Sequence, residues 1–154
     1  MPHASSRRFV WEHPELMIDL PGDWRQESAD ATNSHLELVS DLNRARITIS
    51  ITPVQMPMDQ LEEVARGLMA LHRKYKCEAR GYRLRNETIT PRIEEQSVEL
   101  SYDGQRSGVG TFGFVAFVST RKIVTMCCDR RLSFEAGRAS AMSTLAKGFK
   151  IRLP

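Results

Sequence analysis

The sequence has few cysteines and aromatic residues, little net charge and no long apolar run, so its composition indicates no particular chemistry. Its 154 residues include three cysteines, aromatic residues make up 7% of the chain, and the formal net charge is only +3. The longest apolar stretch, residues 112–118, is far shorter than the roughly 20 residues that a membrane-spanning helix needs. These shortages exclude a disulfide-stapled scaffold, and they predict a protein that is not membrane-embedded.

The cysteines predict free thiols in a reducing compartment. Cys127 and Cys128 are neighbours on an expected strand, where successive side chains point to opposite faces, so they are badly placed for a disulfide with each other. The apolar run around them raises a thiol pKa, which favours a structural role over a nucleophilic one. Residues 1–8 are polar and no apolar segment follows them, so we expect no secretory signal and a cytoplasmic location.

The sequence contains no motif that is typical of a cofactor-binding or metal-binding site. The four histidines lie outside HExxH and Cys/His zinc spacings, so we expect no metal site, no cofactor and no catalytic residue. Gly108, Gly110 and Gly113 have the spacing of a phosphate loop, but they lead into an expected strand instead of a helix N-terminus. We expect these glycines to permit a bend or a close backbone contact.

A long apolar hairpin, residues 108–130, organises the rest of the chain. Two β-prone runs flank the polar turn 119–122, and Val118 is expected to face Ile123 across it. Side-chain alternation then puts an apolar set on each face. The first face carries Phe112, Phe114, Ala116, Val118, Ile123, Thr125 and Cys127, and the second carries Val115, Phe117, Val124, Met126 and Cys128. Since neither face is polar, the hairpin should lie mid-sheet with cover on both sides.

The remaining patterns predict further strands and two helices. Strands are expected at residues 15–20, 35–39, 46–52, 82–90 and 93–102, with a turn at Asp103-Gly104. One amphipathic helix should run from Asp59, its N-cap, to about Lys76, and a second from Ser133 to about Lys147. The fold class is α+β, a mainly antiparallel sheet of about six to seven strands flanked by two helices. We expect one domain, residues 9–154, after a flexible tail, residues 1–8.

Two helices can cover only one face of such a sheet. The other face must be covered by the chain's own loops and N-terminal segment, by a second copy, or by a partner. If a partner covers it, the predicted contact residues are Val115, Phe117, Val124 and Met126 of the hairpin, with Thr48 and Ser50 of the strand at 46–52.

A basic cluster follows the first expected helix, and it is made of Arg73, Lys74, Lys76, Arg80, Arg83 and Arg85. It could bind a small anion or a nucleotide, or it could be the solvated end of a helix, whose C-terminus favours cations. The low net charge and the lack of an aromatic platform beyond Tyr75 and Tyr82 argue against nucleic acid.

Three features together resemble a known superfamily. They are Leu20-Pro21-Gly22-Asp23-Trp24 after the first strand, the order of the elements, and the Phe- and Val-rich hairpin before a terminal helix. Over residues 9–153 the chain resembles the Mog/PsbP-like superfamily, and within it the Eag-type chaperones of bacteria, which accompany type VI secretion effectors. The resemblance implies an α/β/α sandwich without catalytic residues, and a sheet face that shields apolar segments of a secreted effector. The lumenal targeting segment of the photosystem members and the lipid anchor of some bacterial ones are not apparent in this sequence.

The functional hypothesis is therefore a non-enzymatic protein-binding module, a chaperone or adaptor in the bacterial cytoplasm. The alternatives are a small anion- or nucleotide-binding protein that uses the basic cluster at 73–85, and a homodimer that buries the second sheet face without a separate partner.

Overall fold

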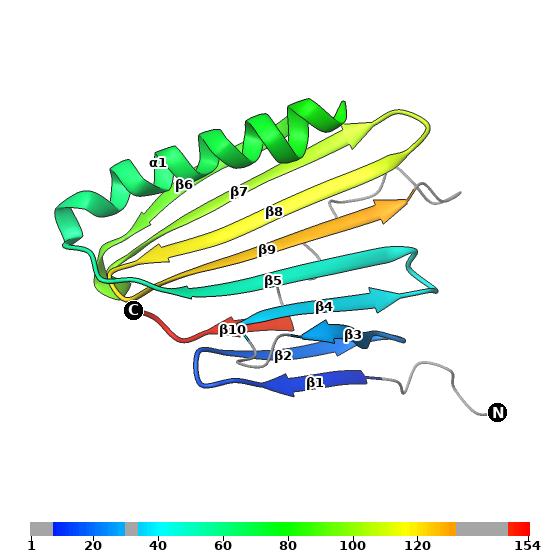
Figure 1. The fold of residues 1–154 in the computed structure, drawn as a ribbon, viewed down its shortest axis with the longest axis horizontal. Helices are drawn as coiled ribbons and strands as arrows, with labels where there is room; N and C mark the ends of the chain where they lie inside the picture. Colours follow the sequence, from blue (N-terminus) through cyan, green and yellow to red (C-terminus); the bar gives the residue numbers. More distant parts are fainter. Residues whose placement is uncertain (1–7, 30–33, 132–147) are drawn as a thin grey trace.

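The computed structural model describes residues 8–29, 34–131 and 148–154, which form two antiparallel sheets and a helix (Figure 1). The larger sheet has seven strands in the order β3–β4–β5–β9–β8–β7–β6. These are β3 (Arg25–Ala29), β4 (His35–Ser40), β5 (Ala45–Pro53), β6 (Arg83–Arg92), β7 (Ser97–Arg106), β8 (Gly110–Ser119) and β9 (Lys122–Arg131). The smaller sheet has the order β1–β2–β10, with β1 (Arg8–Glu12), β2 (Leu16–Pro21) and β10 (Phe149–Ile151).

The predicted hairpin is β8 and β9, and it lies inside the larger sheet. Val118 pairs with Ile123 across the turn, as the alternation required. β7 pairs with β8 on one side, and β5 pairs with β9 on the other. The predicted α+β class and the mainly antiparallel sheet are confirmed.

The helix α1 (Leu61–His72) covers one face of β6, β7 and β8. Its apolar stripe buries Leu61, Ala65 and Met69 against hairpin side chains such as Phe114. The helix begins later than expected: Met58–Gln60 forms a 3-10 turn, and Asp59 makes no capping hydrogen bond. At its end the chain continues through a π-helical turn, Arg73–Cys77. The second predicted helix, from Ser133 to about Lys147, lies outside the described residues.

The smaller sheet covers the opposite face of the larger one. Leu16, Ile18 and Leu20 of β2 pack in one core with the side chains of β4, β5 and β9 that point away from α1. The isoleucines of β5, Ile47, Ile49 and Ile51, belong to this core. The face that the sequence left open is therefore covered, over these strands, by the chain's own N-terminal segment and β10.

Several boundaries differ from the predicted ones. The expected turn at Asp103-Gly104 is wrong, because both residues lie inside β7. Gly104 is there for packing: an added Cβ would lie 3.0 Å from the Cβ of Tyr82 and 3.1 Å from the Sγ of Cys77. β1 and β3 were not predicted, since β1 has three successive apolar residues, Phe9, Val10 and Trp11, and β3 is almost wholly exposed. Arg8, expected in the tail, is the first residue of β1.

Lys122 ties the two sheets together. It lies at the start of β9 with 3% of its surface exposed. Its Nζ donates to the carboxylate of Glu15 and to the backbone oxygen of Arg152, and it lies 3.2 Å from the backbone oxygen of Pro154. The ammonium thus connects the segment before β2, the segment after β10 and the central hairpin.

Replacing Lys122 with methionine is expected to lower the free energy of unfolding by about 2–3 kcal/mol, the usual cost of losing hydrogen bonds to a charged group. The Lys122 hydrogen bond also lowers the pKa of Glu15. A carboxylate with a lowered pKa stabilises the fold above its unfolded pKa, and this stability is lost as the pH falls through the folded value. Urea denaturation at pH 7 and in mild acid measures both effects. Lys150→Met, at an exposed site of β10, is the control and should change the stability little.

Candidate functional site

The first candidate surface lies beside α1 on the larger sheet. α1 contacts β6, β7 and β8, whereas β9, β5 and β4 carry half-exposed side chains on the same face. They alternate with the buried positions that face the smaller sheet. We call this surface the helix-side shelf, and its residues are His35, Glu37, Thr48, Ser50, Thr125 and Cys127.

A row of polar contacts crosses the helix-side shelf. His35 Nδ1 lies 3.1 Å from the hydroxyl of Ser50, and its Nε2 lies 3.8 Å from a carboxylate oxygen of Glu37. Serine, histidine and glutamate are the residue types of a hydrolase triad. However, β5 is paired with a strand on each side, so its amides are used by the ladder and are not free to hold an oxyanion near Ser50. Arg46 also engages Glu37, at 3.1 Å. The row therefore offers half-exposed hydrogen-bonding groups, and Ser50 has no free strand amide beside it to stabilise an oxyanion.

The six predicted partner-contact residues do not form one surface. Val115, Val124 and Met126 are 7%, 0% and 1% exposed in the core beneath the smaller sheet. Phe117, on the same face, is half-buried and packs against that core. Thr48 and Ser50 point to the other face, where they lie on the helix-side shelf. A partner could reach the first three side chains only if the smaller sheet moved away.

The two neighbouring cysteines lie on opposite faces of β9. Cys127 belongs to the helix-side shelf and Cys128 to the core beneath the smaller sheet. Burial, with a contribution from the charge of Asp129, raises the pKa of each thiol to about 12. Both side chains are thus protonated at neutral pH, and neither is poised as a thiolate nucleophile.

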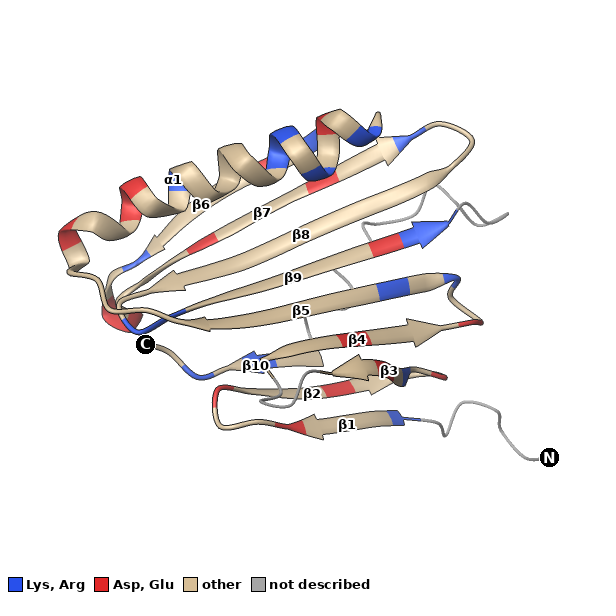
Figure 2. Ribbon diagram, in the orientation of Figure 1, with Lys and Arg blue, Asp and Glu red and all other residues tan. Residues whose placement is uncertain are grey.

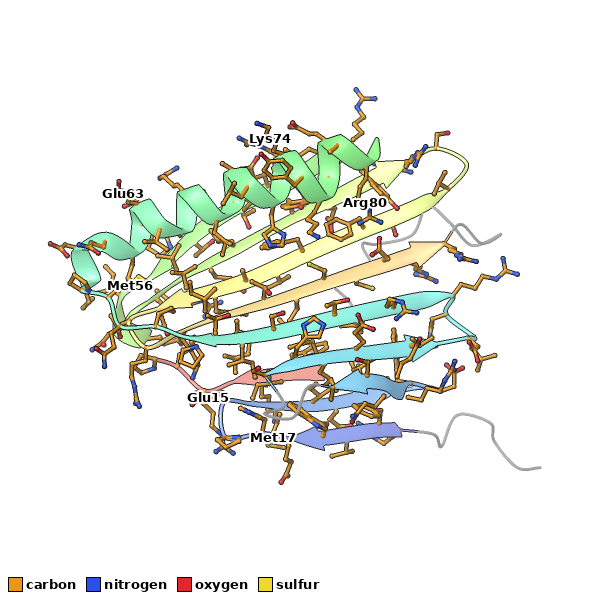
Figure 3. The ribbon with its side chains drawn as sticks, viewed as in Figure 1. Glu15, Met17, Met56, Glu63, Lys74 and Arg80 are labelled. Atoms are coloured by element: carbon orange, nitrogen blue, oxygen red, sulfur yellow. The ribbon has the colours of Figure 1, made fainter. Side chains whose placement is uncertain are left out.

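The predicted basic cluster is dispersed in the structure. Arg73 makes an ion pair of 3.1 Å with Glu87 of β6. Figure 3 shows Lys74 on the outer side of the helical segment, whereas Arg80 lies over the sheet. Of the six cluster residues, only Arg80 lines the hollow described next.

A pocket of about 560 Å³ lies at one end of the helix-side shelf. Its walls come from the end of β4, the start of β5, the segment after α1, the turn between β7 and β8, and the end of β9. Basic segments of β5 and β9 meet at this end of the sheet (Figure 2). We call it the arginine pocket, and its charged lining residues are Arg44, Arg46, Arg80, Arg130, Arg131, Asp41 and Asp129.

Arg80 is the most firmly held cation of the arginine pocket. Its guanidinium donates to Asp129 at 2.8 Å and lies over the rings of Tyr82 and Phe112, 5.1 and 5.3 Å from their centroids. Partial burial alone would lower the pKa of Arg80, but the hydrogen bond and charge of Asp129 raise it above the ordinary value. Arg80 is therefore a fixed positive charge whose position is set before any ligand arrives.

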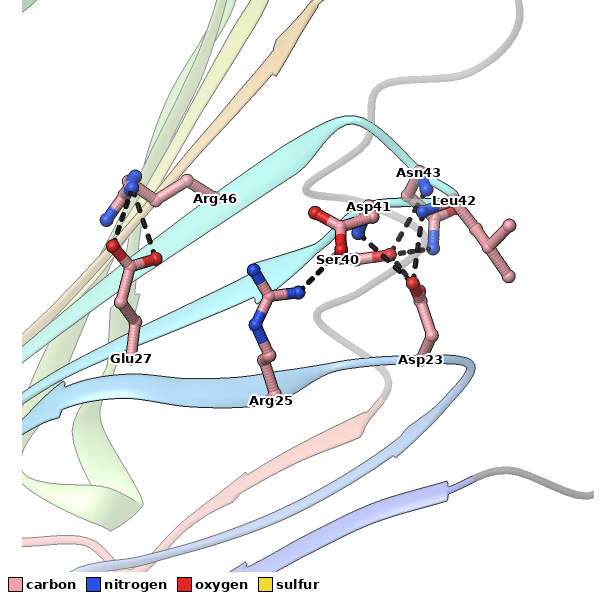
Figure 4. Close-up of polar contacts among 8 residues, drawn as sticks. All are labelled: Asp23, Arg25, Glu27, Ser40, Asp41, Leu42, Asn43 and Arg46. Carbon is pink, nitrogen blue, oxygen red and sulfur yellow. Dashed lines mark hydrogen bonds and ion pairs between the residues drawn. The ribbon is translucent and has the colours of Figure 1, made fainter.

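A network of hydrogen bonds holds the turn that borders the arginine pocket. Asp23 accepts hydrogen bonds from the hydroxyl of Ser40 and from the amides of Asp41 and Leu42, the last two at 3.1 Å (Figure 4). The bond from Ser40 is the main cause of a lowered pKa at Asp23. Arg25 holds the carboxylate of Asp41 at 2.8 Å. The Gly22-Asp23-Trp24 motif noticed in the sequence thus braces the turn between β4 and β5.

Neither a metal centre nor a membrane span emerges from residues 8–29, 34–131 and 148–154. No three His, Cys, Asp or Glu side chains gather there in a way that could hold a metal ion. No helix in these ranges has the length and apolarity to cross a bilayer.

Comparison with known proteins identifies the fold. No family model matches the sequence, and no curated protein matches it. Among solved structures, the chain is similar to the solution structure of cyanobacterial PsbP (CyanoP) from Synechocystis sp. PCC 6803, with a TM-score of 0.61 and 13% identity. The match covers 97% of this chain and 94% of the other. The fold is therefore PsbP-like, as the resemblance in the sequence implied. A sequence identity of 13% supports a shared fold and carries no conclusion about function.

Proposed function

We propose that this chain is a non-enzymatic protein-binding module, a chaperone or adaptor of the bacterial cytoplasm, which holds an extended segment of a partner on the helix-side shelf. The observation that carries the proposal is the row of half-exposed side chains on β4, β5 and β9 beside α1. The Eag-type resemblance, with a secreted effector as the partner, belongs to the same proposal.

The chemistry of the helix-side shelf suggests what the partner segment offers. Thr48 and Thr125 present methyl and hydroxyl groups, Cys127 presents a protonated thiol, and His35 and Ser50 form a hydrogen-bonded pair. A surface of this kind suits an extended segment of small apolar side chains that alternate with hydrogen-bonding groups. The effector segment implied by the resemblance would then meet a less apolar surface than the sequence alone suggested.

Replacing Thr48 with arginine is expected to weaken partner binding about tenfold or more, because a bulky charge at the centre of an interface disrupts its packing. Thr48 lies mid-shelf, between Glu37 of β4 and Cys127 of β9. The partner to test first is the product of the neighbouring gene, since the resemblance implies that chaperone and client are encoded side by side. Titration calorimetry with the co-purified partner measures the change.

The matched control is Thr90→Arg, which adds the same side chain to an exposed position of the edge strand β6 on the opposite sheet face. It should leave the affinity unchanged within about twofold, as is usual away from an interface. Equal loss in both variants would contradict a site on the helix-side shelf. Loss in Phe117→Asp with binding retained in Thr48→Arg would instead place the partner on the far face, and a sedimentation mass of two chains without a partner would favour the homodimer.

A further inference from the structure

We propose that the arginine pocket is a binding site for a small molecule that carries a phosphate group. It stands apart from the proposed partner surface, because its lining residues are at the end of the sheet and include none of the six that define the helix-side shelf. It also differs from the basic cluster seen in the sequence, of which it uses Arg80 only.

The charge of the arginine pocket calls for an anion. Asp129 engages Arg80 at 2.8 Å, and Glu27 and Glu37 engage Arg46 at 3.2 and 3.1 Å. In the part of the chain that the structure describes, no carboxylate makes an ion pair with Arg44 or Arg131. Two guanidinium groups without a carboxylate partner among the described residues lie at one hollow, which favours a doubly charged ligand, and a phosphate group supplies that charge.

The backbone places these two arginines side by side. The amide of Arg131 donates to the carbonyl oxygen of Arg44 at 3.0 Å, which joins the end of β9 to the turn before β5. Arg44 itself has a φ of +50°, a left-handed conformation that an arginine seldom adopts. Strained residues of this kind concentrate at ligand sites, where the surrounding structure holds them in place. Here the hydrogen bonds of Asp23 and of Asp41 hold the turn.

The size and the walls of the arginine pocket fit a small organic molecule. Its volume of about 560 Å³ is within the range of known ligand sites. Tyr82, Val39 and Val109 contribute apolar or aromatic surface next to the guanidinium groups. If Arg44 and Arg131 hold the phosphate, these apolar and aromatic walls can contact the rest of the ligand. Arg80, fixed by Asp129 and two rings, would face it from the helix side.

The test uses pyrophosphate as the probe, titrated into the whole protein by calorimetry at constant ionic strength. The double variant Arg44→Gln/Arg131→Gln should weaken binding about a hundredfold or more, since each of the two charge-assisted contacts is worth at least about a factor of ten. The single variant Arg131→Gln, at an exposed position at the end of β9, provides a second measurement of pyrophosphate affinity. It leaves Arg44 and its turn unchanged, so it disturbs the fold less than the double variant does.

The matched control is Arg83→Gln/Arg121→Gln, which removes the same charge from two exposed sites outside the arginine pocket. It should alter the affinity by less than about twofold, because exposed charges at a distance are screened by salt. Equal weakening in both double variants, or no binding of pyrophosphate to the native protein, would overturn the site. Equally tight binding of tricarballylate, a tricarboxylate, would overturn the assignment to phosphate.

Discussion

Replacing Gly110 with alanine is expected to lower the free energy of unfolding by about 3–5 kcal/mol, from a forbidden backbone conformation and a steric clash together. Gly110 has a φ of +156°, and an added Cβ would lie only 2.0 Å from the carbonyl oxygen of Arg130. That oxygen belongs to the neighbouring strand β9, so it cannot move without breaking the pairing of the central hairpin. Chemical denaturation followed by circular dichroism measures the loss.

Two other glycines supply the controls for this prediction. Gly108 also has a positive φ, +76°, but an added Cβ there meets no atom within 4 Å. Its alanine variant should therefore lose only the conformational cost, about 1–2 kcal/mol. Gly67, inside α1, has neither strain nor a near neighbour, and Gly67→Ala should stabilise the protein by up to about 1 kcal/mol. A similar loss in Gly108→Ala and Gly110→Ala would show that the close contact with Arg130 contributes nothing.

Replacing Phe114 with alanine is expected to cost about 3–5 kcal/mol, the usual range for deleting a buried aromatic ring. Phe114 is 0% exposed between α1 and the sheet. Its ring stacks on His72, with centroids 4.0 Å apart and an angle of 6° between the planes, and it lies 5.2 Å from the ring of Tyr102. The variant would leave a cavity under the last turn of the helix. The same denaturation experiment measures the loss.

The His72 contact adds a pH dependence to this prediction. Burial, and to a smaller extent the charge of Lys76, lowers the pKa of His72. The unfolded chain then binds the proton more readily, so the stability of the native protein should fall as the pH drops below about 6.5, the ordinary pKa of histidine. With Phe114 gone, His72 is better hydrated and this slope should become shallower. His72→Gln removes the titrating group and is the control. An unchanged slope in His72→Gln would assign the pH dependence to other groups.

The contact of His72 with the sheet has a local cause. His72 falls on the edge of the apolar stripe of α1, where its ring can lie against the sheet while the helix exposes its other face. The register of the central hairpin was predicted from alternation, which also describes the inward-pointing isoleucines of β5. Each of these features depends on residues close together in the chain.

The candidate sites could be predicted only in fragments. Thr48 and Ser50 were named from the sequence, and they do lie on an accessible surface, but their supposed neighbours Val124 and Met126 are buried on the other face. Alternation assigns residues to a face within one strand, and it cannot match the faces of strands from different parts of the chain. Whether a partner binds the helix-side shelf stays a prediction.

Of the arginine pocket, only Arg80 was named from the sequence as a candidate anion-binding residue. Arg44 and Arg131 are far apart in the sequence, and they become neighbours because β5 pairs with β9 and the amide of Arg131 reaches the carbonyl of Arg44. The one available signal was the pair of short basic segments at 44–46 and 130–131, each at the end of an expected strand. Strands that pair antiparallel bring opposite ends together, but the sequence does not say which strands pair.

The elements with strong periodicity could be predicted from the sequence, because hydrophobic alternation and helical spacing depend on neighbouring residues. What covers these elements depends on contacts between distant parts of the chain. β2 and β10 come from opposite ends of the chain, yet they lie together on the far face of the larger sheet and bury Val124 and Met126. The burial of apolar surface drives that docking without regard to sequence distance, so the face that is left free for binding is a property of the whole fold.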